Sequence, residues 1–317
     1  MKPEISSITC IGGAAVDRKY HALDSIQPGT SNPVRSERSF GGVARNVAEN
    51  IARLGVSVSL VSILGKDENG RALLDDLKRL GIGTRLLAAS DTHATAEYVA
   101  VLQPDGELAF GLADMAIFDE LAPALLKKIN LESQNDWLFA DCNLPSETMH
   151  ALIDIARQWS LTLAVDAVST PKAARLPRDL TGIGVLFLNL DEARSYLGEI
   201  EATPDEAATR LRTCGAERVV LTLGENGLVA ADRSGVHQIG VVGAKIVDAT
   251  GAGDALIAAT LVSLLKGHAL TEAARLGTAA AALTVESTAS VRPDLSFALL
   301  EATLSLRAGP IFEREPT

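Results

Sequence analysis

Short runs of apolar and β-branched residues alternate along most of this chain with longer stretches whose apolar residues recur every three or four positions. The short runs predict strands buried on both faces, and the longer stretches predict helices with one buried face. Such alternation predicts an α/β fold with a parallel sheet between two layers of helices. The predicted strands are Ser7–Gly12, Val58–Leu64, Trp137–Cys142, Leu161–Val165, Val185–Leu190 and Arg218–Leu223, and the predicted helices between them are Ala44–Leu54, Gly70–Leu80, Ser146–Trp159 and Pro204–Cys214.

The last third of the chain is predicted to be mostly helical. Ala255–Lys266 is an almost continuous apolar stretch of mainly alanine and leucine, which predicts a helix buried on every side. Two further helical patterns cover Thr271–Glu286 and the region near Leu295–Leu306.

Two segments interrupt the alternation. Residues 17–40 are polar and rich in turn signals, and Ala96–Leu102 and Glu107–Leu112 flank a Pro-Asp-Gly turn that predicts a hairpin. These strands have no place in a doubly wound sheet. We therefore expect a small separate sheet, a lid formed by about residues 17–40 and 95–115, near the carboxyl ends of the main strands where ligands bind. A solvent-exposed decorative hairpin is the alternative.

Composition excludes several classes of protein. The 317 residues carry a formal net charge of −11 with no concentrated basic patch, which argues against a nucleic-acid partner. The three cysteines lack the spacing of metal ligands, and Cys10 and Cys142 fall in apolar runs, which predicts buried free thiols and a reducing cytoplasm. The longest apolar run, Ala255–Leu265, is too short to cross a bilayer, and Met1–Glu4 leads into a strand rather than a signal sequence. A cytoplasmic protein without a membrane partner is expected.

The segment Asp248–Asp254 (DATGAGD) is the most informative motif, because its glycines directly precede the apolar helix. Gly251 and Gly253, which flank Ala252, allow a sharp turn in which several N–H groups point at one anion, and the helix dipole adds to that field. A carboxylate at Asp254 would lie beside the anion, where it can take a proton from a hydroxyl while the amides hold a phosphoryl group. An ordinary helix N-cap after a glycine loop is the alternative.

A second candidate site combines glycines with two polar side chains. Gly41 and Gly42 precede a predicted helix that carries Asn46 on its first turn, so a backbone amide and an asparagine could bind a polyol. A tight connection before the helix explains the glycines equally well. Asp17 follows the first predicted strand and is expected at its carboxyl end, where it could accept hydrogen bonds from two sugar hydroxyls. A surface aspartate is the alternative for this residue.

A third candidate site follows two later strands. Asn189 closes a predicted strand and Glu192 lies three residues further on, so both could hold a hydrated magnesium ion or phosphate oxygens through water. The alternative is helix capping by Asn189 or Asp191. Residues 222–227 (TLGENG) end the next strand with two glycines, as expected of a loop that contacts a nucleotide or of a simple turn into a hairpin.

These motifs occur in order and at large separations, and together they resemble the ribokinase-like (PfkB) family of carbohydrate and nucleoside kinases over essentially the whole chain. The resemblance implies a single domain over residues 1–317, with three α/β/α layers, a central mostly parallel sheet and a small β-sheet lid. It also implies ATP and magnesium as cofactors, with transfer of the γ-phosphoryl group to a sugar hydroxymethyl group.

The resemblance also implies a role for each matching residue. Asp254 is the general base, and the amides of Gly251, Ala252 and Gly253 form the anion hole. The acceptor-binding residues are Asp17, Gly41, Gly42, Asn46 and Asn143, and the nucleotide-binding residues are Asn189, Thr222, Gly224 and Gly227. Glu192 holds magnesium through water, and Asp248 matches a position that helps form a monovalent-cation site in some members, which adds K⁺ to the expected cofactors.

The helix start distinguishes members of the family. In the ribokinase pattern a lysine and a glycine follow the glycine pair, whereas Val43 and Ala44 stand there in this chain, which argues against free ribose as the acceptor. Residues 40–54 instead look like those of the family's pseudouridine kinases, as do ADM at 113–115, ADCN at 140–143 and RPDLS at 292–296. This resemblance implies phosphorylation of the 5′-hydroxyl of pseudouridine.

Several alternatives remain at this stage. Asn143, Asp114 or Thr95 could read the base of a nucleoside. Other acceptors are ribose, a ketohexose derivative, inosine or adenosine, and a non-catalytic sugar or nucleotide sensor could share the fold. A nicotinamide oxidoreductase is the competing fold-level interpretation, but the G-x-G-x-x-G fingerprint is missing and no helix follows Gly12-Gly13. Val99, Val101 and Leu108 allow a homodimer through an apolar face of the lid, and side-chain alternation inside a single lid explains these residues equally well.

Overall fold

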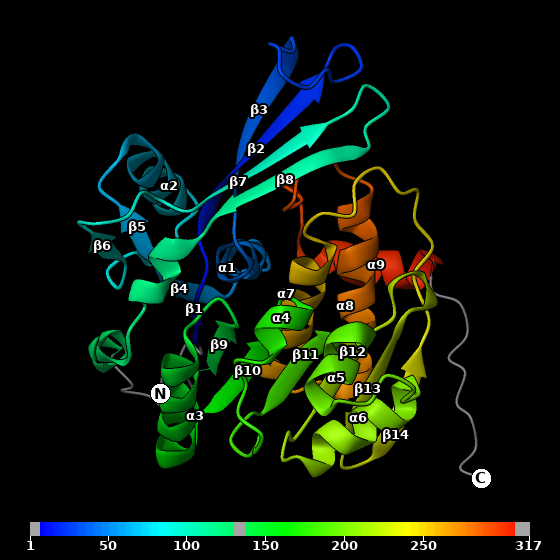
Figure 1. The fold of residues 1–317 in the computed structure, drawn as a ribbon. Helices are drawn as coiled ribbons and strands as arrows, with labels where there is room; N and C mark the ends of the chain where they lie inside the picture. The colour runs from blue at the N-terminus through cyan, green and yellow to red at the C-terminus, as the bar shows by residue number, and fades with distance from the viewer. Residues whose placement is uncertain (1–6, 130–136, 308–317) are drawn as a thin grey trace.

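The computed structural model describes residues 7–129 and 137–307, so the N-terminal prediction for Met1–Glu4 lies outside the described residues. An eight-stranded sheet crosses the body of the protein in the order β14-β13-β12-β11-β10-β9-β1-β4 (Figure 1). The pairs from β4 to β12 are parallel, and the pairs that join β12, β13 and β14 are antiparallel. The strands are β1 (Ser7–Ile11), β4 (Ser57–Val61), β9 (Trp137–Asp141), β10 (Thr162–Asp166), β11 (Val185–Asn189), β12 (Val219–Thr222), β13 (Leu228–Asp232) and β14 (Gly235–Ile239).

Helices cover both faces of this sheet, as the alternation predicts. One face packs against α1 (Val43–Arg53), α2 (Glu68–Arg79), α7 (Ala252–Leu265), α8 (Leu270–Val285) and α9 (Phe297–Arg307). The other face packs against α3 (Ser146–Trp159), α4 (Thr170–Ala173), α5 (Leu190–Leu197) and α6 (Pro204–Thr213). The three-layer α/β arrangement expected from the sequence is therefore confirmed.

The predicted strand Val58–Leu64 is wrong as a single element. The chain forms β4 up to Val61 and then a separate strand β5 (Ile63–Gly65), which pairs with β6 (Ala88–Ser90) in a two-stranded sheet. The break falls at Ser62, whose buried hydroxyl donates to the carbonyl oxygen of Gly12 at 2.6 Å. This hydrogen bond, between residues 50 positions apart, lies where the chain leaves the main sheet inside an otherwise continuous apolar run.

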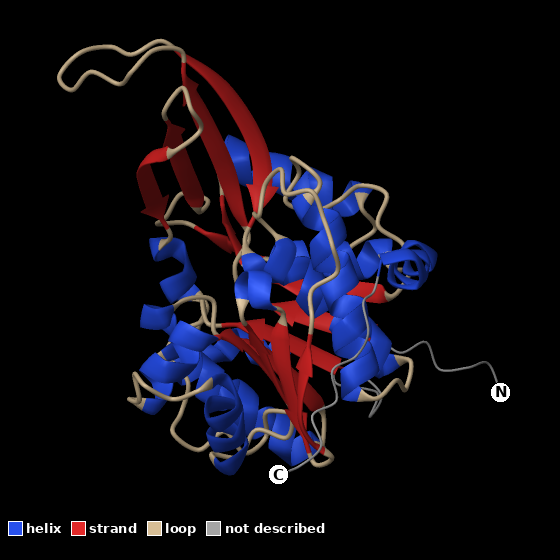
Figure 2. Cartoon of the chain, turned by 90° about the vertical axis from the view of Figure 1, so that its right-hand side faces the viewer, coloured by secondary structure: helices blue, strands red, loops and turns tan. Residues whose placement is uncertain are grey.

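A second, four-stranded sheet projects from one end of the body (Figures 1 and 2). Its order is β3-β2-β7-β8, formed by β2 (Ala15–Ala22), β3 (Val34–Gly41), β7 (Glu97–Leu102) and β8 (Leu108–Asp114). Both segments that interrupt the sequence alternation therefore contribute to one small sheet. Asp17 lies within β2 and not in a loop after β1, because Gly12, at φ 145°, and Gly13 carry the chain directly from one sheet into the other.

The helix α7 is the most deeply buried element of the site region. Ten consecutive residues from Ala255 to Leu264 are buried, as expected from its continuous apolar sequence. It approaches α8 closely at Gly277, where an added Cβ would lie 2.4 Å from the hydroxyl oxygen of Thr260. Cys10 and Cys142 are buried free thiols. Within residues 7–129 and 137–307, no helix has the length and apolar character needed to cross a membrane.

Candidate active site

The site is centred on the first turn of α7. Gly251 is the N-cap of this helix in the left-handed region at φ 82°, and an added Cβ would lie 1.9 Å from the carbonyl oxygen of Ser290. Gly253, by contrast, is exposed, and an added Cβ would meet nothing within 4 Å. The first N–H groups of a helix lack partners inside the helix, so this open turn presents donors and the positive end of the dipole to a ligand.

Asp254 lies on that same turn and contacts a second helix. Its Oδ2 accepts a hydrogen bond of 2.8 Å from Nδ2 of Asn46 on α1. Burial raises the pKa of Asp254 to about 7, and the like charges of Asp141 and Asp17 act in the same direction, whereas the bond from Asn46 opposes them. A carboxyl group that titrates near neutral pH is suited to accept a proton from a hydroxyl. The structure thus brings together two residues that are 208 positions apart in the sequence.

The start of α1 is held by Asp141, which lies in the 140–143 segment noted in the sequence but was given no role there. This fully buried carboxylate accepts hydrogen bonds from the backbone N–H groups of Gly13 at 2.9 Å, Ala44 at 2.8 Å and Asn143 at 2.9 Å. It therefore joins the end of β9 to the glycine turn after β1 and to the N-terminus of α1. A negative charge is favourable at the start of a helix. Its sequence signals were its place in the 140–143 segment and at the end of a buried strand, and neither predicts these hydrogen bonds.

The predicted acceptor-binding residues lie around this junction. Asp17 faces Gly41 across the β2–β3 pair so closely that an added Cβ on Gly41 would lie 2.0 Å from Asp17 Oδ2. Burial raises the pKa of Asp17 to about 6, although the charges of Arg45 and Lys19 lower it. Gly42, at φ 94°, lies against the backbone of Gly13, where an added Cβ would be 2.5 Å from the carbonyl oxygen.

Asn143 lies at the same junction, on the far side of Gly13. It is 6% exposed, and its Oδ1 accepts a hydrogen bond of 2.5 Å from Nζ of Lys172. Arg175 donates to the backbone carbonyl of Asn143 at 2.7 Å and fixes the segment after β9. Lys172 was missed in the sequence, because its partner lies 29 positions away.

Three of the four predicted nucleotide-binding residues, Asn189, Thr222 and Gly224, line one cavity at the carboxyl ends of β11 and β12. It has a volume of about 520 Å³, and its lining includes Asn189, Asp191, Thr222, Gly224 and Asn226. Asn189 and Thr222 are direct neighbours in the β11–β12 register. Three of the four residues expected to contact a nucleotide are therefore adjacent in space.

Gly227 lies against the neighbouring strand. At φ 85°, an added Cβ there would lie 2.1 Å from the carbonyl oxygen of Ile239 on β14. The turn 222–227 joins β12 to the antiparallel strand β13, as the hairpin alternative predicts. Contact between Gly227 and a nucleotide stays a prediction.

Asn189 and Glu192 form a capping box at the start of α5. Asn189 Oδ1 accepts from the Glu192 N–H at 2.9 Å, and the Glu192 carboxylate accepts from the Asn189 N–H at 2.9 Å and from its side-chain amide at 2.8 Å. The capping alternative is thus the arrangement in the structure. Burial raises the pKa of Glu192 despite these hydrogen bonds. Free lone pairs on the carboxylate can still accept a water molecule.

A fifth carboxylate interacts electrostatically with both parts of the site. Asp166 ends β10, and burial raises its pKa well above the usual value, with the charges of Asp254, Glu192 and Asp141 acting in the same direction. Val168, two residues later, has φ 67°, which is rare for a β-branched side chain and is typical of strain at a functional site. Sequence reasoning missed Asp166, because a lone aspartate at a strand end carries no distinguishing pattern.

Asp248 contacts the four-stranded sheet. Its Oδ2 lies 2.6 Å from Nζ of Lys19 on β2, and its Oδ1 accepts a hydrogen bond of 2.8 Å from the N–H of Thr250. These contacts outweigh partial burial and lower the pKa of Asp248. The anion loop and the four-stranded sheet are therefore joined by an ion pair that the sequence analysis did not foresee.

Comparison with known proteins matches this arrangement. The pfkB family carbohydrate kinase profile matches residues 6–295, and the chain belongs to that family. It is therefore a phosphotransferase that acts on a hydroxyl group of a sugar or nucleoside. The resemblance stated from the motifs alone is confirmed.

The relatives and solved structures cover nearly the whole chain. The chain is 28% identical to a pseudouridine kinase of Escherichia coli (92% of this chain, 94% of the relative) and 28% identical to a guanosine-inosine kinase of Exiguobacterium acetylicum (90% and 96%). A carbohydrate kinase from Agrobacterium tumefaciens superimposes with a TM-score of 0.84 at 33% identity over 95% of this chain and 98% of that one. A ribokinase of Arabidopsis thaliana, solved in complex with ribose and ATP, has a TM-score of 0.77 at 19% identity over 96% and 99%.

Proposed function

We propose that this protein transfers the γ-phosphoryl group of ATP to the 5′-hydroxyl of pseudouridine, giving ADP and pseudouridine 5′-phosphate. The observation that carries the proposal is the placement of Asp254 on the open first turn of α7, with its carboxylate held by Asn46. In this mechanism Asp254 takes the proton of the acceptor hydroxyl. The amides of Gly251, Ala252 and Gly253 bind the phosphoryl oxygens as charge spreads over them.

The choice of acceptor rests on the sequence around α1 and on one relative. Val43 and Ala44 replace the lysine and glycine of the ribokinase pattern, and a pseudouridine kinase is similar to the chain over 92% of its length. The guanosine-inosine kinase supports a second candidate acceptor, a purine nucleoside. Asp17, Gly41, Gly42, Asn46 and Asn143 would bind the acceptor.

We propose that ATP, with magnesium, binds in the cavity at the carboxyl ends of β11 and β12. Asn189, Thr222 and Gly224 would contact the nucleotide, as would Gly227 through the turn it shapes. Within the described residues, no group of three or more acidic, histidine or cysteine side chains is arranged to hold a metal ion directly. Mg²⁺ commonly keeps several waters and binds through substrate phosphates, and we propose Glu192 as its contact through water. When bound, the ion would neutralise charge on the phosphates.

The decisive test is a phosphoryl-transfer assay of the protein and of Asp254→Asn with ATP and Mg²⁺. Pseudouridine, uridine, ribose, inosine and adenosine would be compared as acceptors, and pseudouridine should give the highest kcat/KM. Asp254→Asn should retain nucleotide and acceptor binding but lower kcat by roughly two to four orders of magnitude, since a positioned general base contributes about that much. Undiminished turnover in the variant would remove Asp254 from the role.

We infer that Lys19 takes the place of a potassium ion at Asp248. A cation already neutralises this carboxylate at 2.6 Å, so the residue predicted as a K⁺ ligand is occupied by the protein itself. We expect turnover to change by less than about twofold when K⁺ is replaced by tetramethylammonium at constant ionic strength. Stimulation by K⁺ of tenfold or more in the unaltered protein would contradict this inference.

We also propose that the four-stranded sheet acts as a lid over the acceptor and as a dimer contact. Val99 and Val101 pair with Leu112 and Phe110 across β7 and β8, so these four apolar side chains share one face of the sheet. Phe110 and Leu112 are 54% and 60% exposed. Lys19, which contacts Asp248, lies on the opposite face because side chains alternate along β2. One face would therefore serve the acceptor site and the other a second copy of the chain.

A further inference from the structure

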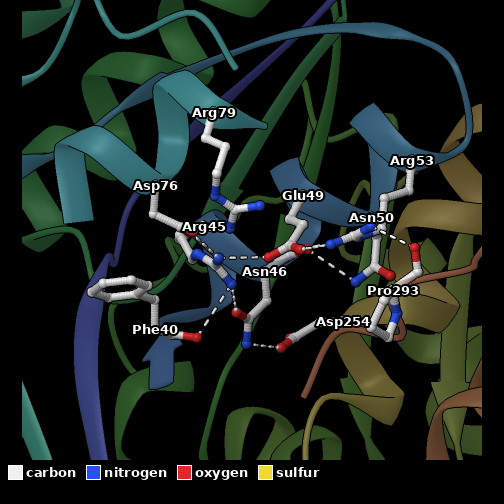
Figure 3. Close-up of polar contacts among 10 residues, drawn as sticks. All are labelled: Phe40, Arg45, Asn46, Glu49, Asn50, Arg53, Asp76, Arg79, Asp254 and Pro293. Atoms are coloured by element: carbon white, nitrogen blue, oxygen red, sulfur yellow. Dashed lines mark hydrogen bonds and ion pairs between the residues drawn. The ribbon is translucent and has the colours of Figure 1, made fainter. Parts of the chain in front are cut away.

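Arg45 is a buried ion held between two helices. Its side chain is 5% exposed, and its Nη2 lies 2.5 Å from Glu49 Oε2 on α1 and 2.8 Å from Asp76 Oδ2 on α2 (Figure 3). Arg79 and Arg53 also pair with Asp76 and Glu49, respectively. The guanidinium is thus fixed in place by two carboxylates that are themselves anchored.

The other terminal nitrogen of Arg45 reaches the site. Nη1 donates to the Oδ1 of Asn46 at 3.0 Å and to the carbonyl oxygen of Phe40 at 3.2 Å. A guanidinium only donates hydrogen bonds, so its partner in the Asn46 amide is the oxygen and not the nitrogen. The amide nitrogen is thereby turned toward Asp254, where Figure 3 shows it in contact with the carboxylate.

The opposite orientation of the amide would have two costs. The Asn46 oxygen would face the Asp254 carboxylate, so that two acceptors would be in contact. The amide N–H₂ would meet the guanidinium, so that two donors would be in contact. Arg45 therefore decides which atom of Asn46 the catalytic carboxylate contacts.

We propose that Arg45 is a positioning residue for the general base: acting through Asn46, it presents a hydrogen-bond donor to Asp254 and keeps that carboxylate ionised and aimed at the acceptor hydroxyl. The inference rests on the proposed function of Asp254. Arg45 does not touch the reacting atoms in this arrangement. It contributes the orientation of one amide and a favourable positive charge near the base.

The surrounding charges explain why the base needs this support. Carboxylates face Asp254 from three strands: Asp17 on β2, Asp141 at the end of β9 and Asp166 at the end of β10. Each makes a second negative charge less favourable. Arg45 on α1 is the cation whose charge acts in the opposite direction on Asp254. Loss of Arg45 would therefore remove a favourable charge and release the amide that donates to the base.

The test is the pH dependence of kcat in Arg45→Met, with Arg53→Gln as the matched control. Arg53 lies on the same helix and pairs with the same Glu49, but its other partner is the carbonyl oxygen of Pro293, and not Asn46. In Arg45→Met we expect the acid limb of the profile to move up by about one pH unit, which lowers kcat roughly tenfold at pH 6.5 but less than about threefold at pH 9. Arg53→Gln should leave the midpoint where it is.

A purely structural role for Arg45 would lower stability or kcat equally at all pH values, and that result would overturn the proposal. A neutron structure of the unaltered protein supplies a measurement that needs no variant. Deuterons on the Asn46 nitrogen should face Asp254, and deuterons facing Arg45 would also overturn it. If Asp254→Asn itself kept full turnover, the proposed function would fail. If Asp254→Asn lost turnover while the Arg45→Met profile did not move, only this inference would fail.

Discussion

At the scale of single residues, Asp254 is placed where its charge is costly. Burial among other carboxylates raises its folded-state pKa to about 7, whereas an unfolded chain has the ordinary value near 3.8. The stability contributed by this group is therefore complete below about pH 4 and is lost as the pH rises through 7. A site arranged for proton transfer thus opposes folding at the pH where it works.

Replacement of Asp254 by Asn should therefore stabilise the protein above neutral pH. We expect a gain on the order of 1 kcal/mol in the free energy of unfolding at pH 8, which shrinks toward zero near pH 4. Urea denaturation of both proteins at the two pH values measures the difference. A variant that is less stable than the parent at pH 8 would show that the charge is not costly in the folded state.

Single residues also show which parts of the site a sequence can reveal. Asp254, Asn46 and Asn189 could be predicted because each lies next to a glycine turn or strand end that marks a local motif. The role of Asp141 could not, although the residue stands in the 140–143 segment, because the feature that defines that role is a bond to Gly13, 128 positions away. Arg45 stands within a recognised motif, but its partner Asp76 lies 31 positions away on another helix.

At the scale of elements, the two glycines on the first turn of α7 have different roles. Gly251 needs its positive φ and lies against Ser290, whereas Gly253 lies in open space where a ligand would approach.

Gly251→Ala and Gly253→Ala should accordingly fail in different ways. Gly251→Ala should lose roughly 1–3 kcal/mol of stability through strain and overlap. Gly253→Ala should keep or slightly raise stability, because alanine favours a helix, but should raise the KM for ATP several-fold by crowding the phosphate. Thermal unfolding and steady-state kinetics of both variants make the comparison. An unaltered KM in Gly253→Ala would place the phosphate elsewhere.

The sequence predicts whether an element is a helix or a strand better than it predicts the residues at which the element begins and ends. The predicted helix Ser146–Trp159 coincides with α3 because its apolar period is uninterrupted. Val58–Leu64 divides into two strands at Ser62, which bonds to Gly12 just after the neighbouring strand β1. Leu228–Asp232 and Gly235–Ile239 were not predicted, although they extend the main sheet, because their pairing follows from the turn at Gly227 and from contact with β12.

At the scale of the whole molecule, the exposed apolar face of the four-stranded sheet predicts self-association. We expect Phe110→Glu together with Leu112→Asp to convert a dimer to a monomer in light scattering coupled to size exclusion. Burial of such side chains supplies most of the energy of an interface, and a buried unpaired charge opposes it. Ile200→Asp is the control, since Ile200 is 79% exposed on another part of the surface. A parent protein that is monomeric at all concentrations would contradict the proposed contact.

The placement of Asp17 on β2, apart from Asn46 on α1 and Asp254 on α7, has a consequence for selectivity. A substrate whose hydroxyl groups bind all three residues would hold the four-stranded sheet against α1 and α7. A substrate analogue that lacks the hydroxyl bound by Asp17 would still bind to α1 and α7. The four-stranded sheet would then stay open, and water would still reach the phosphate-binding turn. Discrimination against such analogues would then appear as a low kcat and as hydrolysis of ATP without phosphoryl transfer, more than as a high KM.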